Sequence, residues 1–403
     1  MKEPIWENST AKEYLEQLGG SKAGAYQYLH DAHPELRKHL PTGTAYLPPD
    51  GNVDEFLKRV DTSKRKIVRG CHPLDVNGMV DVVCTCPDQR DIREVRGAIG
   101  KVLSVAQDAD VRSYMEYESG KPFDGKVGVL VQNYYGKERG SIIEHPHERG
   151  VYRVEHVTPT ISSHENVDTY IADETGQAFD VWTARLAPEA DKLYKEKQDL
   201  AASRIQQIIT LYRKIQETGL MPSTHSFQME FGATSEEIMF YQARLFKPFE
   251  PKADFPIELG GFDENDTGWK SVVTPYNVFG ITPEKGTEFK LIDLTAEAVE
   301  EHKGNESLAY KHGAFFRHLS LGLEVQPRNM KAYLPRDEAL LEHGHYRWMQ
   351  KSPLTIGGIR DDHEIERIRE TTDDIRVRLC SNGVRGGYSF IIPKKKRRGK
   401  RKD

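Results

Sequence analysis

The chain has 403 residues, of which 37% are hydrophobic and 30% charged, and its formal net charge is −5. This length allows two domains, or three small ones, each with its own core. No window approaches eighteen apolar residues and the first twenty residues lack the apolar core of a signal peptide, which argues against a membrane span and a leader. We therefore expect a soluble, cytoplasmic protein with no membrane partner.

The cysteines are too few for a secreted disulfide framework in a chain of this length. They are Cys71, Cys84, Cys86 and Cys380. The Cys84 and Cys86 pair could indicate a metal site, but no second Cys/His pair follows at zinc-finger spacing. Buried strand thiols are the favoured interpretation.

Short helical patterns broken by glycine and proline fill residues 1–60. Residues 64–86 read as strands with a loop between, and the apolar run 127–131 reads as a buried strand. Residues 151–182 carry strand and turn signals. A long helix follows over residues 187–218, with its apolar positions on one face and Gly219 as its stop.

Two strands are expected next, over residues 226–231 and 238–245, joined by a turn around Gly232. Residues 247–251 (KPFEP) are typical of a domain boundary. The remainder to residue 393 reads as a mixed α/β segment ending in a strand, 375–380, and a glycine-rich hairpin, 382–391.

Two short pieces have the composition of a phosphate site. The first is residues 19–25 (GGSKAGA), where glycines precede a helix and Lys22 follows them. Such a turn lets backbone N–H groups approach an anion at the positive end of the helix. The second is Arg69, which ends a strand before Gly70 and could bind phosphate oxygens bidentately. A glycine break before a surface helix and a surface arginine would give the same patterns.

A third piece places a carboxylate among large apolar residues. Glu230 lies within FQMEF, and Gln242 and Arg244 lie within FYQAR. A carboxylate in such a setting is either exposed at an edge or paired with a cation. One carboxylate and one amide oxygen can also hold Mg²⁺ when nucleotide phosphates supply further ligands. An ordinary amphipathic hairpin with Glu230 in solvent is the alternative.

Taken in order, these pieces resemble the ATP-binding domain of pyruvate phosphate dikinase and phosphoenolpyruvate synthase. The resemblance covers roughly residues 15–250 and rests on six segments. They are residues 19–25 (GGSKAGA), 41–43 (PTG), 68–71 (VRGC), 127–132 (VGVLVQ), 140–146 (GSIIEHP), and 228–231 (QMEF) with 241–244 (YQAR).

The resemblance implies an α+β, ATP-grasp fold that holds ATP between two lobes. It implies phosphate contacts from the glycine turn at Gly20 and from Lys22 and Arg69, and an adenine contact near Gln132. Glu230 and Gln242 would hold Mg²⁺, and Arg244 would face the γ-phosphate. Phosphoryl transfer then requires mainly positioning and charge neutralisation.

The sequence also departs from this family. The serine-rich loop after the strand-end arginine is replaced by residues 70–75 (GCHPLD), where only Asp75 is acidic, and the threonine before the proline of residues 140–146 is absent. The chain is too short to contain the phosphoenolpyruvate-binding barrel of the full-length enzymes. Either a separate subunit supplies it, or this protein phosphorylates something else, or it carries out no transfer.

The C-terminal segment resembles a swivelling phosphohistidine domain only in outline. His343 falls where the phosphate-accepting histidine would lie, and His363 is a weaker rival. A neutral imidazole can act as a nucleophile toward phosphorus. A surface His-Gly-His turn is the alternative interpretation.

We therefore predict an ATP-grasp domain over residues 1–250, a small α/β domain over 251–393 and a disordered basic tail over 394–403. The expected function is phosphoryl transfer from Mg-ATP to a histidine or to an unknown acceptor. An ATP-grasp ligase and a non-catalytic nucleotide-sensing or RNA-associated module remain alternatives.

The tail is the one strongly basic segment of the sequence. It carries +7 against −12 for the rest of the chain. Such a segment could make a weak nucleic-acid contact or could serve only for solubility.

Overall fold

The computed structural model divides the chain into two compact units, the first containing Met1–Phe249 and the second beginning at Glu250. In the first unit the structure describes residues 6–61, 64–73, 92–107, 112, 116, 121–135, 138–146, 148–157, 168–182, 190–234 and 236–249. In the second unit it describes seven strands only. His343, Asp75, Cys84, Cys86, His363 and the basic tail lie outside the described residues.

The first unit begins with two helices, α1 (Ser9–Gln17) and α2 (Gly20–Ala32), which are followed by the 3₁₀ helix η1 (Pro34–His39). Asn8 caps α1, because its side-chain oxygen accepts a hydrogen bond from the Ala11 amide at 3.1 Å. Gly19, which precedes α2, has φ +87°, a left-handed conformation that favours glycine. The predicted glycine turn before a helix is confirmed.

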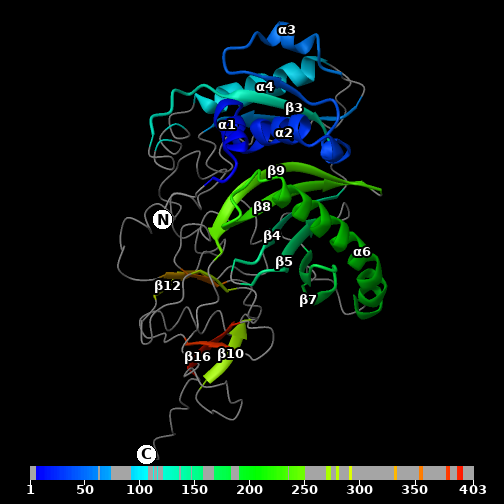
Figure 1. Cartoon of the computed structure of the whole chain (residues 1–403), viewed down its shortest axis with the longest axis vertical. Coiled ribbons are helices and arrows are strands. Elements are labelled where there is room, and N and C mark those ends of the chain that lie inside the picture. Colours follow the sequence, from blue (N-terminus) through cyan, green and yellow to red (C-terminus); the bar gives the residue numbers. More distant parts are fainter. Residues whose placement is uncertain are drawn as a thin grey trace, which may run out of the picture. The chain divides into compact units, whose positions relative to one another are not determined.

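A three-stranded antiparallel sheet lies beside these helices in the order β1-β3-β2 (Figure 1). Its strands are β1 (Ala45–Leu47), β2 (Lys66–Cys71) and β3 (Gly128–Asn133). The short helix α3 (Val53–Leu57) precedes β2, and α4 (Ile92–Ala106) contacts β2. Val95, Ile99 and Val102 recur at helical spacing along α4 and are all buried.

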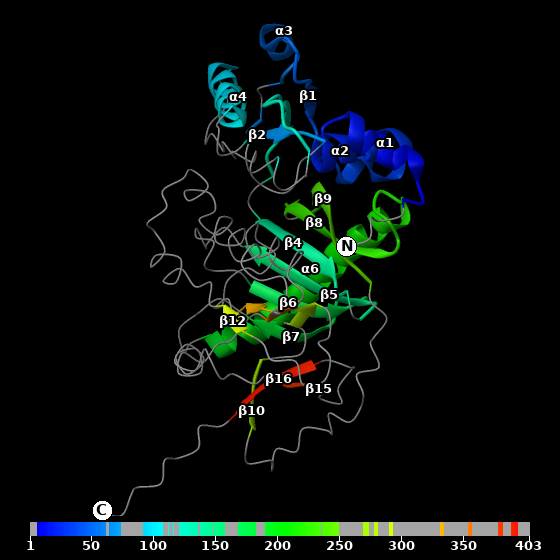
Figure 2. The same cartoon turned by 90° about the vertical axis from the view of Figure 1, so that its left-hand side faces the viewer.

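The larger sheet has six antiparallel strands in the order β7-β6-β5-β4-β8-β9. In chain order they are β4 (Glu138–Glu144), β5 (Val151–Val157), β6 (Asp168–Asp173), β7 (Ala178–Trp182), β8 (His225–Ala233) and β9 (Ile238–Pro248). Helix α6 (Ala190–Glu217) lies between β7 and β8 in sequence and extends along this sheet (Figure 2).

One face of the six-stranded sheet forms the main core with α6. Tyr212 stacks on Phe227 with ring centroids 4.2 Å apart, and its hydroxyl donates to the Phe227 carbonyl at 2.9 Å. Met229 and Phe231 extend the same row along β8, and both are buried in this core. The strand alternation and the amphipathic helix that the sequence predicts therefore meet in one apolar layer.

One local prediction was wrong. Gly232 is not a turn residue, because it pairs with Met239 inside the β8–β9 ladder. A Cβ at Gly232 would lie 2.4 Å from Cε2 of Tyr241, so glycine is needed there for close packing rather than for a turn. The predicted boundary segment, residues 247–251, contains the end of β9 at Pro248 and the division between the two units after Phe249.

The described strands of the second unit form three small sheets. One has the order β10-β16-β15, from β10 (Trp269–Val273), β15 (Arg378–Ser381) and β16 (Tyr388–Pro393). The others pair β11 (Val278–Gly280) with β14 (Leu354–Ile356), and β12 (Lys290–Ile292) with β13 (Lys331–Tyr333). The antiparallel β15–β16 pair agrees with the strand and hairpin predicted near the end of the chain.

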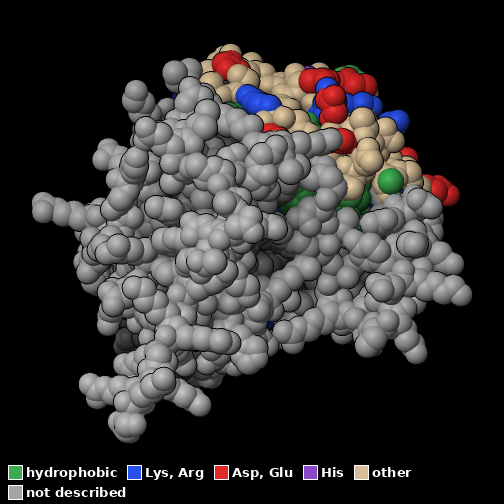
Figure 3. Space-filling view, turned by 90° about the horizontal axis from the view of Figure 1, so that it is seen from below, with side chains coloured by type: hydrophobic (Ala, Val, Ile, Leu, Met, Phe, Trp, Pro, Cys, Tyr) green, Lys and Arg blue, Asp and Glu red, His purple; other side chains and the backbone are tan. Residues whose placement is uncertain are grey.

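None of the helices within the described residues combines the length and apolar character that a membrane crossing requires. On the visible part of the described surface, acidic and basic side chains lie beside one another (Figure 3).

Candidate functional site

Four polar side chains share one face of the β8–β9 pair. The register places Glu230 opposite Gln242 and Gln228 opposite Arg244. Side chains of a strand alternate between the two faces of its sheet, and Phe227, Met229 and Phe231 point into the α6 core. The four polar residues therefore lie on the opposite face, although Gln228, Gln242 and Arg244 are also buried.

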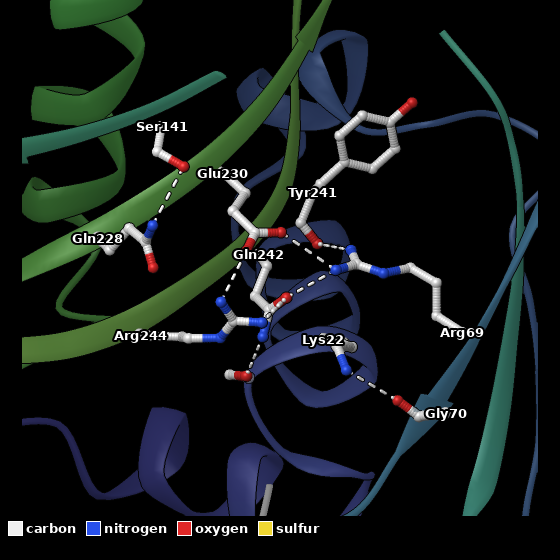
Figure 4. Close-up of polar contacts among 10 residues, drawn as sticks. Lys22, Arg69, Gly70, Ser141, Gln228, Glu230, Tyr241, Gln242 and Arg244 are labelled. Carbon is white, nitrogen blue, oxygen red and sulfur yellow. Dashed lines mark hydrogen bonds and ion pairs between the residues drawn. The ribbon is translucent and has the colours of Figure 1, made fainter. Parts of the chain in front are cut away.

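Two arginines from distant parts of the sequence converge on Glu230 and Gln242 (Figure 4). Arg69 of β2 donates to Glu230 Oε2 at 3.1 Å and to Gln242 Oε1 at 2.7 Å. Arg244 donates to Glu230 Oε1 at 2.6 Å and to Gln242 Oε1 at 2.8 Å. The carboxylate and the amide oxygen are thus held between two guanidinium groups.

This cluster, defined here as Arg69, Glu230, Gln242 and Arg244, is largely shielded from solvent. The arginine side chains are 4% and 3% exposed, and that of Glu230 is 20% exposed. Charge interactions are stronger in such surroundings than at an exposed surface. Glu230 is paired with cations rather than solvated, so the simple amphipathic-hairpin interpretation was wrong.

The glycine turn brings the beginning of α2 to this cluster. Gln242 donates its amide N–H to Ser21 Oγ at 2.7 Å. The neighbouring Lys22 is fully buried and donates to the Gly70 carbonyl at 3.0 Å, directly after Arg69 in β2. The first N–H groups of a helix have no acceptor within the helix, and this end carries a partial positive charge. Lys22, the start of α2 and both arginines therefore occupy one neighbourhood.

Gln132 lies on the same face of the three-stranded sheet as Arg69. In the β2–β3 register Arg69 is opposite Leu130, and Gln132 follows two positions later in β3. Its amide N–H group lies 3.5 Å from Thr44 Oγ1. Its Oε1 is buried and has no hydrogen-bond partner among the described residues. A buried acceptor of this kind is suited to a donor from water or a ligand.

The donor set allows a limited test of the predicted magnesium site. The described residues contain no group of three or more His, Cys, Asp or Glu side chains arranged around a common metal position. Mg²⁺ can nevertheless use one or two protein ligands when waters and phosphates complete its octahedron. Glu230 and Gln242 fit that pattern, but their oxygens accept hydrogen bonds from the arginines and would have to exchange partners.

Sequence reasoning missed several contacts at the site. Ser21 was treated only as part of the glycine turn. The carbonyl of Tyr241 accepts a hydrogen bond from Arg69 at 3.4 Å, and its hydroxyl accepts one from the Tyr135 amide at 2.8 Å. Burial raises the pKa of Tyr241, so its hydroxyl stays protonated. In the sequence, the sign that Tyr241 would lie near the cluster was its position directly before Gln242.

A second missed feature is a buried ion pair on β5. Arg153 Nε donates to Glu155 Oε1 at 2.8 Å, and these side chains are 1% and 3% exposed. Ser141 of β4 pairs with Glu155 on one side and with Glu230 on the other. The polar face therefore continues from the cluster across β4 to β5. In the sequence, the sign of this polar face was the alternation of charged and apolar residues over 151–155.

No protein-family model and no curated protein matches the sequence. Among solved structures, the D-alanine–D-alanine ligase from Coxiella burnetii is similar to 59% of this chain, with 10% identity and a TM-score of 0.30. The matched part spans only 49% of that ligase, about half its length.

Two other solved structures have comparable likeness. ACD1 of Ca. Korarchaeum cryptofilum, in complex with coenzyme A, has 13% identity and a TM-score of 0.32, covering 56% of this chain and 92% of that one. ATP citrate lyase from Methanothrix soehngenii, in complex with citrate and coenzyme A, has 12% identity and a TM-score of 0.31, covering 79% and 80%. These values are too low to decide fold family or activity.

Proposed function

We propose that the first unit binds Mg-ATP at the cluster and catalyses transfer of the γ-phosphoryl group to an acceptor. The observation that carries this proposal is the convergence of Arg69 and Arg244 on one carboxylate and one amide beside the start of α2. Guanidinium groups bind phosphate oxygens bidentately, and a helix N-terminus favours anions. These are the groups that a polyphosphate chain requires.

Each residue has a distinct part in this proposal. Arg69, Lys22 and the turn at Gly20 bind phosphate oxygens, and Arg244 stabilises charge on the transferred group. Glu230 and Gln242 hold Mg²⁺ once the phosphates engage the arginines. Gln132 offers its buried oxygen to a donor group on the base. Catalysis then rests on positioning and charge neutralisation, as in other phosphoryl transfers.

The acceptor class separates two forms of this function. Transfer to a histidine would give a phosphoprotein, for which His343 is the candidate. Transfer to a carboxylate substrate would give an acyl phosphate, as in a ligase, and no label would remain on the protein. The resemblance in the sequence favours transfer to a histidine. The cluster would bind Mg-ATP in the same way for transfer to a carboxylate.

Calorimetric titration of ATP with Mg²⁺ tests the nucleotide site. Removing a charge-assisted hydrogen bond costs about 1.5–3 kcal/mol, so Arg244→Gln should weaken ATP binding by roughly 10–100-fold. Arg213→Gln is the matched control, because Arg213 lies on the exposed face of α6 and pairs with Glu174. Equal affinities for the wild type and a folded Arg244→Gln variant would refute the proposed site.

Labelled ATP then identifies the acceptor class. Incubation with γ- and β-labelled ATP should give acid-labile protein label if a histidine accepts phosphate, and His343→Asn should abolish that label. Label that persists in His343→Asn would place the acceptor elsewhere. ATP binding without any label, with ADP formed only when a carboxylate and an amine are added, would favour the ligase form.

A further inference from the structure

A pocket of about 510 Å³ lies between α1, α2 and the β1 side of the three-stranded sheet. Tyr14, Tyr26 and Tyr46 contribute aromatic rings to it, and Glu13 and Asp31 contribute carboxylates. None of the described residues that line it is a lysine or arginine. Its chemistry is therefore opposite to that of the cluster, where arginines converge.

Three of the side chains that line the pocket use their polar groups in hydrogen bonds within the protein. Tyr14 donates its hydroxyl to Asp31 Oδ2 at 3.2 Å, and Gln27 donates to the same oxygen at 2.8 Å. The hydroxyl of Tyr26 hydrogen-bonds with the Thr44 side chain. Around Asp31 the pocket therefore presents carboxylate oxygens and tyrosine rings to a ligand.

The two carboxylates of the pocket differ in their surroundings. Burial opposes ionisation of Asp31, but hydrogen bonds from Gln27, His30 and Tyr14 outweigh it and hold the pKa of this carboxyl below its ordinary value. Glu13 forms no ion pair in the part of the chain that the structure describes. It therefore adds a second carboxylate with which no described cation is paired.

The inner wall of the pocket is formed by the ring of Tyr46, which packs closely against the backbone of β3. Tyr46 lies against Gly128 of β3, where a Cβ would come within 2.4 Å of the Tyr46 hydroxyl oxygen and 2.6 Å of its ring. Leu130 lines the same wall. Burial raises the pKa of Tyr46 to about 12, so the ring stays neutral and keeps its electron-rich face. Neutral aromatic faces attract organic cations.

We propose that this pocket binds a small organic cation, a primary ammonium group on an apolar body. Asp31 and Glu13 would pair with the ammonium, and the tyrosine rings would pack against the body. The two carboxylates oppose the binding of polyphosphates, so the pocket is a second ligand site whose chemistry differs from that of the proposed nucleotide site. In α2, Lys22 is directed to Gly70, whereas Tyr26 lines the pocket.

A pair of probes that differ in charge tests this inference. Phenethylammonium is cationic, and N-acetylphenethylamine has the same ring but is neutral. Calorimetry on the full chain should show phenethylammonium binding about tenfold or more tightly than the neutral probe, because only the cation gains the ion pair and the cation–π contact. Equal affinity of the two probes, or no binding of the cation at millimolar concentration, would overturn the proposal.

Matched variants assign the effect to the pocket. Asp31→Asn should weaken phenethylammonium binding severalfold, and Glu13→Gln provides a second, solvent-exposed test should Asp31→Asn lose its fold. Glu16→Gln, on the same helix but paired with Lys12, should have no effect. Unchanged affinity in both pocket variants would refute the site. Arg244→Gln should leave phenethylammonium binding intact. The pocket proposal can therefore fail or succeed independently of the nucleotide proposal.

Discussion

The two faces of the β8–β9 pair are built from alternate residues of the same strands, yet they serve different purposes. One face carries Phe227, Met229 and Phe231 into the core against α6. The other carries Gln228, Glu230, Gln242 and Arg244, and Arg69 joins it from β2. Both faces are largely buried. The difference is that one excludes polar groups and the other satisfies them with one another.

If the polar face binds nucleotide as proposed, apolar packing and ligand binding are carried by different side chains of a single hairpin. Apolar burial is non-directional and depends on filled volume. A buried polar cluster is held by specific hydrogen bonds, and such networks cost free energy when any member is removed. Substitutions on the apolar face should therefore lower stability and leave binding unchanged, whereas substitutions on the polar face should alter binding as well as stability.

The largest expected effect is on the apolar face. Phe231 is 1% exposed and packs over Gly140, where a Cβ would meet its ring at 2.6 Å. Phe231→Ala should lower the free energy of unfolding by about 3–5 kcal/mol, through lost burial and the cavity it leaves. Urea denaturation measures this loss. The folded fraction should bind ATP with unchanged affinity, and a large affinity loss without destabilisation would break the separation of the faces.

A smaller and different effect is expected from Glu230→Gln. This change keeps the shape but removes the carboxylate that both guanidinium groups contact, costing about 1.5–3 kcal/mol of stability. Mg²⁺ should no longer tighten ATP binding, because the carboxylate ligand is gone. Titrations with Mg²⁺ and with EDTA give this comparison.

The exposed Glu236, in the loop of the same hairpin, supplies the control for that experiment. Glu236→Gln should keep the wild-type response to Mg²⁺. If Glu230→Gln also retains the full response, the metal is held by other residues and the predicted role of Glu230 is wrong.

The smallest effect tests how closely the two faces are coupled. Gly232→Ala would place a Cβ 2.4 Å from the Tyr241 ring, and overpacking of this kind costs about 1–3 kcal/mol. Movement of Tyr241 should weaken its hydrogen bond with the Tyr135 amide, which faster amide exchange would report.

Gly97→Ala is the opposite case. No neighbouring atom lies within 4 Å of a Cβ there, and the position is an exposed one in α4. Alanine should stabilise the helix by about 0.5–1 kcal/mol. If the Gly232→Ala variant is as stable as Gly97→Ala, the Tyr241 ring moves aside without a loss in the free energy of unfolding.

Much of the secondary structure followed from local patterns. The long helix, predicted over 187–218, is α6 (Ala190–Glu217), and the strand predicted over 127–131 lies at β3 (Gly128–Asn133). These assignments succeed because side chains repeat every 3.6 residues in a helix and every two in a strand. Gly232 was misread, because a glycine required by a neighbouring ring has the same local signature as a glycine in a turn.

The candidate site was predictable only in part. Glu230, Gln242 and Arg244 were identified as a set because they lie on adjacent strands close in sequence. Ser21 and the carbonyl of Tyr241 were missed, since nothing local marks a hydroxyl or a backbone oxygen that will meet Arg69 or Gln242. The tyrosine pocket has no linear motif at all, because its walls come from α1, α2, β1 and β3.

Local patterns in the sequence specify most of the helices and strands and which side chains of each strand share a face, because these properties depend on neighbours along the chain. The packing of distant elements is what brings Arg69 and Arg244 to one carboxylate, directs Lys22 to Gly70, and gathers acidic and aromatic residues in the pocket beside α2. Such contacts join residues up to 221 positions apart, as Gln242 and Ser21 show. They are selected by the packing of whole elements, which no local pattern encodes.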